Sequence, residues 1–196
     1  MKKKKITAVS IMLAAAVLIW FFVFLLTVKY ITVLVIEPFD KENTSIKHNN
    51  KELVFSGLEF DNQEESFVIS YTHSVNKGRV KDYYAVKKSG ENYILEMFKT
   101  RFLSYGAGMS DPEENEVFLQ TDDYIEISGM QRQMPFLVMA VGVIADHCIE
   151  IESHTIMLTS YFTPQQRIKI QYKKITLIKY LESVMYKRFI EVTNIN

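Results

Sequence analysis

The sequence predicts an all-β domain, an antiparallel sandwich or barrel, joined to an N-terminal transmembrane helix and a short C-terminal helix. Three observations lead to this fold class: short apolar segments alternate with frequent turns, a long uncharged segment lies near the N-terminus, and the tail has a helical pattern of apolar residues. The 196 residues divide into a cytoplasmic tail (1–5), a transmembrane anchor (6–28), a linker (29–51), the β domain (52–173) and a helical tail (174–196).

The membrane anchor is predicted from Ile6 to Val28, 23 residues without a charge. At a rise of about 1.5 Å per residue, this segment spans a hydrocarbon layer of roughly 30 Å. Lys2 to Lys5 precede it, so the positive-inside rule places the N-terminus in the cytoplasm and the main domain outside the cell membrane, as a single-pass protein. A cleaved signal peptide is the alternative. The apolar segment is too long for one and no small-x-small cleavage site follows it, so we expect an uncleaved anchor.

Charge and cysteine content exclude several classes of function. The formal net charge is zero, but the first 28 residues hold four basic and no acidic residues, which leaves 19 basic and 23 acidic residues beyond them. This net charge of −4 argues against nucleic-acid binding, which needs a concentrated basic face. Cys148 is the single cysteine, so the chain forms neither an intrachain disulfide nor a thiolate zinc site. We expect no cofactor.

The stretch from residue 67 to residue 109 predicts three consecutive strands. Residues 67–75 alternate between apolar and polar side chains, and residues 80–86 and 93–105 return across turn signals. Residues 136–143 are apolar throughout, which predicts a central strand covered on both faces. Further strands are expected at 53–55, 116–119, 124–128, 148–151, 155–158 and 167–172, with a turn at Ser128-Gly129.

The tail is predicted to be an amphipathic helix. Ile175, Ile178, Leu181, Met185 and Phe189 recur at intervals of three or four residues, with lysine, glutamate and arginine between them. We expect this apolar face to pack on the sheet. A role at a partner or membrane surface is the alternative.

The central stretch also contains the candidate binding residues. They are His73, Ser74, Arg101, Tyr105, Gly106, Ala107 and Gly108. The two glycines allow positive φ angles, and consecutive amides in such a turn form either an anion-binding nest or a tight corner. Arg101 and Tyr105 fall on one face of the predicted strand, where the planar guanidinium of Arg101 suits a carboxylate ligand or an internal acid.

His73 and Ser74 do not predict a hydrolase. His73 shares a strand face with Phe67, Ile69 and Tyr71, which is typical of a histidine at the edge of the core or on the floor of a pocket. Ser74 points to the opposite face. A nucleophile and its base must lie within hydrogen-bonding distance, and adjacent strand residues do not meet in this way.

A metal site is also not expected. His147, Glu150, Glu152 and His154 cluster in the sequence, but strand alternation directs His147 away from the other three. Such a spread of polar residues is typical of a solvated face.

Two short motifs lie at the ends of this central region. The first reads His73-Ser74-Val75 and the second reads Arg101-Phe102-Leu103-Ser104-Tyr105-Gly106-Ala107-Gly108. Together they resemble the HSV-E and R-F-x-S-Y-G-A-G motifs of small exported proteins of unknown function, which are encoded beside TAXI-type TRAP transporters, the tripartite ATP-independent periplasmic transporters of organic acids. Asn76 stands where that family has an acid, and Met109-Ser110 where it has Leu-Pro. The resemblance covers about residues 53–172.

What the resemblance implies is an association with a transporter rather than a reaction. The hypothesis is a membrane-anchored extracytoplasmic accessory protein of a TRAP-type organic-anion transport system, without enzymatic activity. It would contact a transporter subunit or its binding protein through the candidate residues. The alternative is a stand-alone extracytoplasmic module that binds a small carboxylate with Arg101 and the glycine loop, and a hydrolase is the third possibility.

Overall fold

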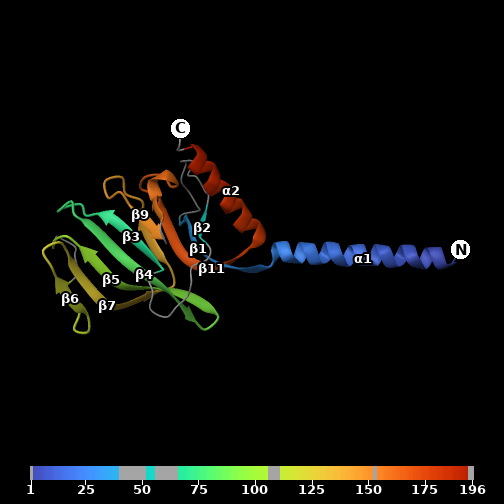
Figure 1. Cartoon of the computed structure of the whole chain (residues 1–196), viewed down its shortest axis with the longest axis horizontal. Coiled ribbons are helices and arrows are strands. Elements are labelled where there is room, and N and C mark those ends of the chain that lie inside the picture. Colours follow the sequence, from blue (N-terminus) through green and yellow to red (C-terminus); the bar gives the residue numbers. More distant parts are fainter. Residues whose placement is uncertain (1, 40–51, 56–65, 106–110, 152–153, 194–196) are drawn as a thin grey trace. The chain divides into compact units, whose positions relative to one another are not determined.

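The computed structural model describes residues 2–39, 52–55, 66–105, 111–151 and 154–193. The chain forms two compact units: residues 1–32 with 174–196, which carry both α-helices, and residues 33–173, which carry nearly all of the strands (Figure 1). The predicted all-β fold class with an N-terminal and a C-terminal helix is confirmed. Each unit is described in turn.

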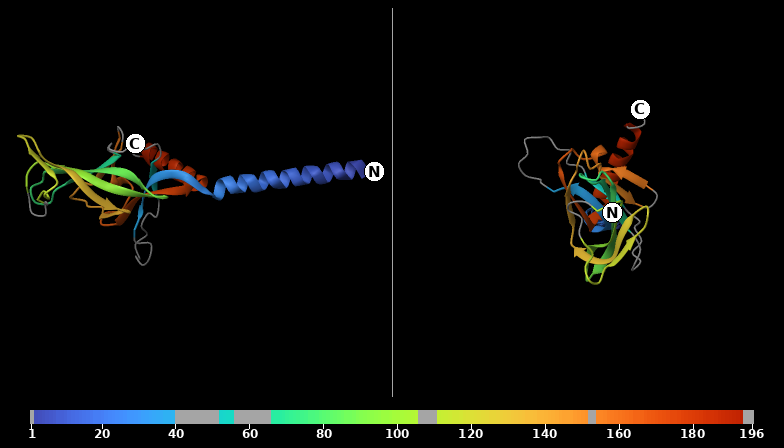
Figure 2. Two further views of the ribbon diagram at one scale, coloured as in Figure 1. Left: turned by 90° about the horizontal axis from the view of Figure 1, so that it is seen from below. Right: turned by 90° about the vertical axis from the view of Figure 1, so that its left-hand side faces the viewer.

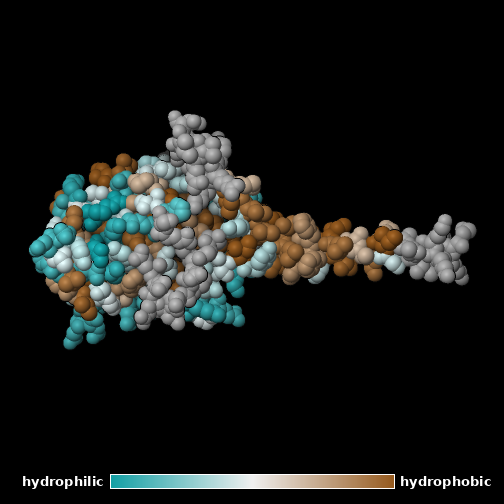
Figure 3. Space-filling view, viewed as in Figure 1, coloured by the Kyte–Doolittle hydropathy of each residue, from teal (hydrophilic) through white to brown (hydrophobic). Residues whose placement is uncertain are grey.

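Helix α1 (Lys2–Thr27) begins with four lysines and has no charged residue after them. Its segment Ser10–Thr27 is long and apolar enough to cross a membrane, and none of it is buried. Figure 3 shows an unbroken hydrophobic surface along these residues. A membrane anchor and a signal sequence share this property. The Thr27 hydroxyl donates a 2.8 Å hydrogen bond to the carbonyl oxygen of Val23 at the helix end.

Helix α2 (Leu177–Thr193) begins where the last strand stops. Ile178, Leu181 and Met185 on its predicted apolar face are exposed. Ile175 is buried, but it belongs to the preceding strand.

The larger sheet has seven strands in the order β10-β9-β3-β4-β5-β7-β6. Its strands are β3 (Phe67–Thr72), β4 (Arg79–Ser89), β5 (Asn92–Phe102), β6 (Val117–Gln120), β7 (Ile125–Met134), β9 (Cys148–Ile151) and β10 (His154–Met157). All of their pairings are antiparallel. The predicted meander is therefore present as β3-β4-β5, with β9 added beside β3 from a distant part of the chain.

The smaller sheet has four strands in the order β2-β1-β11-β8. They are β1 (Lys29–Pro38), β2 (Leu53–Phe55), β8 (Leu137–Ala140) and β11 (Arg167–Thr176); a short 3-10 helix, η1 (Leu158–Ser160), follows β10. In the right-hand view of Figure 2, β1 and β11 lie on one side of the unit and the green and yellow strands lie on the other. The two sheets form a sandwich. Between them, the rings of Tyr93 in β5 and Tyr172 in β11 contact each other edge to face, with 4.9 Å between the ring centroids.

The core lies on one face of the seven-stranded sheet. Val80, Phe102, Ile125 and Ile127 are buried there, and each apolar side chain removed from water contributes about 1.5–3 kcal/mol. The opposite face carries charged residues, because alternate residues of a strand point to opposite sides. The sequence pattern of β3, β4 and β5 thus places one apolar face inward and one charged face outward.

Strand β1 corrects the predicted linker. Residues 29–38 form a strand between β2 and β11, and Val33 to Ile36 have no exposed area. Because both faces of β1 are covered, its sequence is uniformly apolar and lacks the alternation of a half-buried strand. The rest of the predicted linker, residues 40–51, lies outside the described residues.

Four strands also differ from the predictions. Strand β7 continues through the expected turn at Ser128-Gly129; Gly129 has φ 80° and lies opposite a register shift in β5, as expected for a bulge. Strand β8 is short and lies at the edge of its sheet, so the expected central strand at 136–143 is wrong. Strand β3 ends at Thr72 and β5 at Phe102, three residues earlier than predicted in each case.

Candidate binding site

The ends of β3, β4 and β5 meet at one end of the seven-stranded sheet. Thr72 pairs with Arg79, and Val80 pairs with Phe102, so the 73–78 turn lies next to the segment that follows β5. This end is on the left in Figure 1. We call it the motif end, since both sequence motifs reach it.

His73 organises the turn between β3 and β4. Its amide donates to the Gly78 carbonyl oxygen at 2.8 Å, and its own carbonyl oxygen accepts a hydrogen bond from Lys77 at 3.1 Å. Its ring nitrogen Nδ1 accepts from the amide of Val75 at 3.3 Å. The side chain of His73 is buried. Its Nδ1 atom therefore holds the turn together from inside.

Asn76 joins the two motifs. Its Nδ2 atom donates to the carbonyl oxygen of Ser104 at 2.7 Å and lies 3.2 Å from the Ser104 hydroxyl. Its Oδ1 atom accepts from the amide of Gly78 at 3.0 Å. An amide suits this position because it donates on one side and accepts on the other. A carboxylate would accept from Gly78 but could not donate to the Ser104 carbonyl oxygen.

Arg101 pairs with an internal acid. Its Nη2 and Nε atoms lie 2.6 Å and 3.1 Å from Oε2 of Glu126, its cross-strand neighbour in β7. The guanidinium also lies over the ring of Tyr124, 4.1 Å from the centroid. The hydrogen bonds with Glu126 raise the pKa of Arg101 above its ordinary value. Of the two partners considered from sequence, the structure places the internal acid beside Arg101.

The sequence predicted that Tyr105 shares a strand face with Arg101, and this prediction is wrong. Strand β5 ends at Phe102, and the carbonyl oxygen of Ser104 bonds to Asn76 instead of continuing a ladder. The Tyr105 ring contacts Phe102 edge to face at 5.3 Å and lies near Phe118 at 6.3 Å. Gly106, Ala107 and Gly108 lie outside the described residues.

An apolar patch is exposed at the motif end. It consists of Val75, Leu103, Tyr105 and Phe118, whose exposed fractions range from 41% to 64%. Ser74 is exposed beside Val75. We call these four residues the motif-end patch. Exposed apolar side chains gathered in this way are typical of an interaction surface.

A second loop borders this end. The amide of Thr72 donates to the carbonyl oxygen of Ala145 at 2.6 Å, which places the 142–147 loop beside the end of β3. Val143 and Ile144 in this loop are also exposed. Asp146 has a positive φ of 50°. The apolar surface at the motif end is therefore extended by a loop far away in sequence.

Arg79 fixes that loop, a role that the sequence analysis missed. Its Nη1 atom donates to the carbonyl oxygen of Asp146 at 3.0 Å, and its Nη2 atom donates to the hydroxyl of Ser70 at 2.9 Å and contacts Cys148 Sγ. Glu150 accepts from Ser70 at 3.0 Å and from Lys81 at 2.9 Å. These bonds connect β3, β4 and β9 on the polar face.

The comparisons with known proteins concern this same sheet. The model of the family described as "Domain of unknown function (DUF1850)" matches residues 67–158. A DUF1850 domain therefore lies within the chain. No curated protein and no solved structure matches the chain significantly.

The DUF1850 domain contains the whole seven-stranded sheet and strand β8. Both motif segments, the motif-end patch and the 142–147 loop lie inside it. Strands β1, β2 and β11 and both helices lie outside it. The candidate site is thus built from the DUF1850 domain alone.

A half-buried carboxyl group lies on the core face of the DUF1850 domain and was missed from sequence. Asp82 pairs with Ile69 on one side and Thr100 on the other, and its Oδ1 accepts from the Thr100 hydroxyl at 2.6 Å. Burial raises the pKa of Asp82, and hydrogen bonds from Thr100 and Tyr71 only partly oppose this. Burial, together with Asp82, raises the pKa of Tyr71 to about 12. The signal for this group was a lone acid on the apolar face of an alternating strand.

Of the four residues weighed as a metal site, the three that the structure describes do not form a metal-binding group. His147 lies against the ring of Tyr71 and accepts from the amide of Gly142 at 3.0 Å, and burial and then the charge of Arg79 lower its pKa. Glu150 is bonded to Ser70 and Lys81, and His154 is exposed in β10. Glu152 lies outside the described residues. Within the described part of the chain, no three histidine, cysteine, aspartate or glutamate side chains form a metal-binding group.

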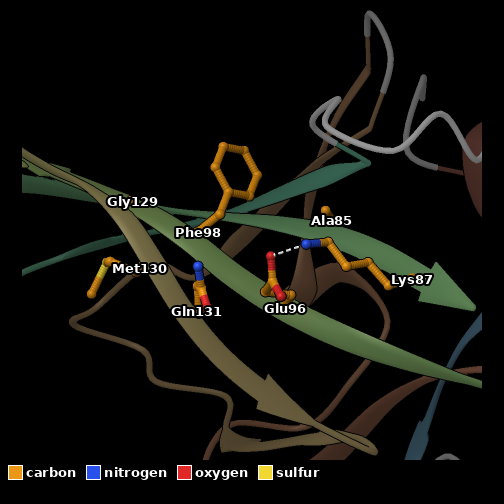
Figure 4. A pocket seen from close by; sticks show the side chains of 7 residues that line it. All are labelled: Ala85, Lys87, Glu96, Phe98, Gly129, Met130 and Gln131. Carbon is orange, nitrogen blue, oxygen red and sulfur yellow. Dashed lines mark ion pairs between the residues drawn. The ribbon is translucent and has the colours of Figure 1, made fainter. Parts of the chain in front are cut away.

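A shallow hollow of about 290 Å³ lies beside the bulge of β5 and β7. Its lining comprises Ala85, Lys87, Glu96, Phe98, Gly129, Met130 and Gln131. Figure 4 shows the ion pair between Lys87 and Glu96 within it. None of the four predicted site residues that the structure describes (His73, Ser74, Arg101 and Tyr105) lines this hollow. The two charges in its lining pair with each other.

Proposed function

We propose that this protein is a membrane-anchored, non-enzymatic accessory protein of a TRAP-type organic-anion transport system. In this proposal, the motif-end patch contacts a transporter subunit or its binding protein. The observation that carries the proposal is the patch itself. Asn76 joins two motif segments 28 residues apart. Val75, Leu103 and Tyr105 are exposed at their junction, beside the exposed polar residues Ser74, Lys77 and Ser104.

The chemistry of the motif end favours a protein partner over a small carboxylate. Leu103, Tyr105 and Phe118 offer apolar surface, and the exposed Lys77 of the 73–78 turn lies at the same end of the sheet. The cation that the sequence offered, Arg101, is engaged by Glu126 at 2.6 Å. A protein surface with matching apolar side chains gains free energy by covering this patch.

The burial of His73 also argues against a hydrolase. Its Nδ1 atom accepts from a backbone amide within the turn, whereas Ser74 is exposed. A general base must accept the proton of its nucleophile, and here that ring atom serves the fold.

The proposed topology is a single membrane pass with the N-terminus in the cytoplasm. Its support is the uncharged length of α1 and the four lysines before it. Mass spectrometry of the mature N-terminus tests retention of the segment, and protease digestion of intact cells tests the side. An N-terminus beyond residue 28 would show a cleaved signal instead.

Co-purification from native membranes in mild detergent tests the partner. The full-length protein is compared with the Leu103→Ser, Phe118→Ser double variant and with Phe136→Ser as a matched control. Phe136 is exposed to the same degree as Phe118 but precedes β8, in the other sheet. We expect a TRAP-type subunit to accompany the wild type and the control and to be lost from the double variant.

Two results would contradict this proposal. Recovery of the subunit with the folded double variant would move the contact away from the motif end. Failure to recover a TRAP-type subunit with the wild type, under conditions that preserve other membrane complexes, would reject the accessory role. In that case, thermal stabilisation by organic acids would test the carboxylate-binding module.

A further inference from the structure

Helix α2 exposes an apolar stripe. Thr176 caps the helix, and its hydroxyl accepts from the amide of Lys179 at 3.3 Å. Ile178, Leu181 and Met185 follow at spacings of three and four, so they lie on one side of the helix. Their exposed fractions are 42%, 48% and 64%. The helix therefore exposes these three apolar side chains on one side.

The opposite side of α2 is the buried side. Ser183 is buried, and Tyr180 and Val184 are half-buried. A helix that folds onto its own protein would be expected to bury its apolar side chains first. The inverted arrangement in α2 indicates that an apolar environment covers the stripe.

Charge is divided sharply between the two units. Residues 1–32 and 174–196 contain nine basic and two acidic residues, a net charge of +7, whereas residues 33–173 contain 14 basic and 21 acidic residues, a net charge of −7. Residues 174–196 alone contain four basic and two acidic residues. The helical unit therefore complements an anionic surface, and the β unit does not.

The end of α1 indicates where such an anionic surface would lie. The two helices belong to one unit and contact each other. Lys29 and the exposed Tyr30 follow α1, and these residue types are enriched where a helix leaves the hydrocarbon layer. An apolar helix with no buried residue between 10 and 27 requires lipid around it, so α2 meets the same bilayer near its surface.

We propose that α2 lies in the headgroup region of the anionic leaflet from which the chain emerges after α1. Ile178, Leu181 and Met185 face the acyl chains. Lys174 and Lys179, exposed near the start of the helix, extend their ammonium groups toward lipid phosphates. Glu182, also exposed, lies at the edge of the stripe, between Ile178 and Met185. This inference concerns the helical unit and does not depend on a transporter partner.

Spin-label depth measurements on the full-length protein test the inference. Single cysteines replace Ile178, Leu181, Met185 and, as the control, Val143, in a Cys148→Ser background shown to be folded by circular dichroism. The protein is reconstituted in phosphatidylcholine vesicles with and without phosphatidylglycerol. We expect the stripe labels to lose accessibility to a nickel chelate and gain accessibility to oxygen in the anionic vesicles, while the label at 143 does not change.

Three outcomes would overturn the inference. Nickel accessibility at 178, 181 and 185 as high as at 143 in anionic vesicles would show that α2 stays in water. Equal protection in both lipids would reject the charge component. Protection that arises only when another protein is added would assign the stripe to that protein. Hydrogen exchange on unlabelled wild-type protein provides the second readout, with slower exchange of amides 178–185 expected in anionic vesicles.

Discussion

Replacing Glu37 by glutamine tests whether residues 29–38 belong to the core rather than to a linker. The carboxylate of Glu37 is 4% exposed and lies 3.0 Å from Lys169 Nζ and 2.9 Å from Lys173 Nζ, both in β11. It also accepts from Gln171 at 2.7 Å. A glutamine has nearly the same shape but no charge, so it leaves two ammonium groups without a counter-ion.

The expected loss follows from burial and distance. Removing one partner of a buried ion pair typically costs about 3–5 kcal/mol. Lys169 and Lys173 keep 24% and 29% of their side chains exposed, so they regain some hydration in the variant. We therefore expect Glu37→Gln to lower the free energy of unfolding by about 2–3 kcal/mol, which corresponds to a fall of roughly 5–10 °C in melting temperature for a domain of this size.

The pH dependence of the stability provides a second test of the interaction between Glu37 and the two lysines. Burial alone would raise the pKa of Glu37, but hydrogen bonds and charges from Lys173 and Lys169 outweigh it and hold the pKa below its usual range. A carboxyl group with a lowered folded pKa stabilises the fold above its unfolded pKa of about 4.3 and loses that contribution as the pH falls through the folded value. The wild type and the variant should therefore converge in acid.

Urea unfolding of the full-length protein in mild detergent provides the assay. Near-ultraviolet circular dichroism of the tyrosines is the signal, because the single tryptophan, Trp20, lies in α1. Glu91→Gln, at an exposed glutamate in the β4–β5 turn, is the matched control and should change stability by less than about 0.5 kcal/mol. An equally small change for Glu37→Gln at neutral pH, or a difference that grows below pH 4, would refute the reasoning.

Two further variants address the DUF1850 domain. Asn76→Ala removes its bonds to Ser104 and Gly78 and should lower unfolding free energy by about 1–2 kcal/mol in the same urea assay, because partly exposed hydrogen bonds contribute about 0.5–1.5 kcal/mol each; unchanged stability would contradict the proposed junction. Asp82→Asn should raise stability at neutral pH, because burial raises the pKa of Asp82 and disfavours its ionised form. That advantage should shrink as the pH falls through the folded pKa toward the unfolded value near 3.9, and a variant less stable than the wild type at pH 7 would contradict this assignment.

Local patterns were sufficient to predict the central meander. Strands β3, β4 and β5 are consecutive, their turns carry local signals, and one face of each is apolar. Strand β1 was assigned to the linker, because both of its faces are covered and its sequence continues the apolar character of α1 without alternation. The apolar segment that contains β8 predicted a central strand, but β8 lies at the edge of its sheet. Pattern alone does not reveal which strands become neighbours.

The candidate site was predicted in part for the same reason. His73 and Arg101 lie near one end of the sheet because the meander brings them there, but their partners depend on details of geometry. Arg79 was missed because its contacts with Asp146 and Cys148 require β9 to lie beside β3. That neighbour is about 70 residues away in sequence, and no local signal specifies it.

Photo-crosslinking in native membranes tests the central claim most directly. A photoreactive amino acid replaces Leu103 in the motif-end patch or, as the control, Phe136 outside it. The account predicts a crosslink from position 103 to a TRAP-type subunit or its binding protein, and none to these proteins from position 136. Crosslinks to such a protein from 136 alone, or to neither partner from 103 in a folded and membrane-inserted protein, would contradict it.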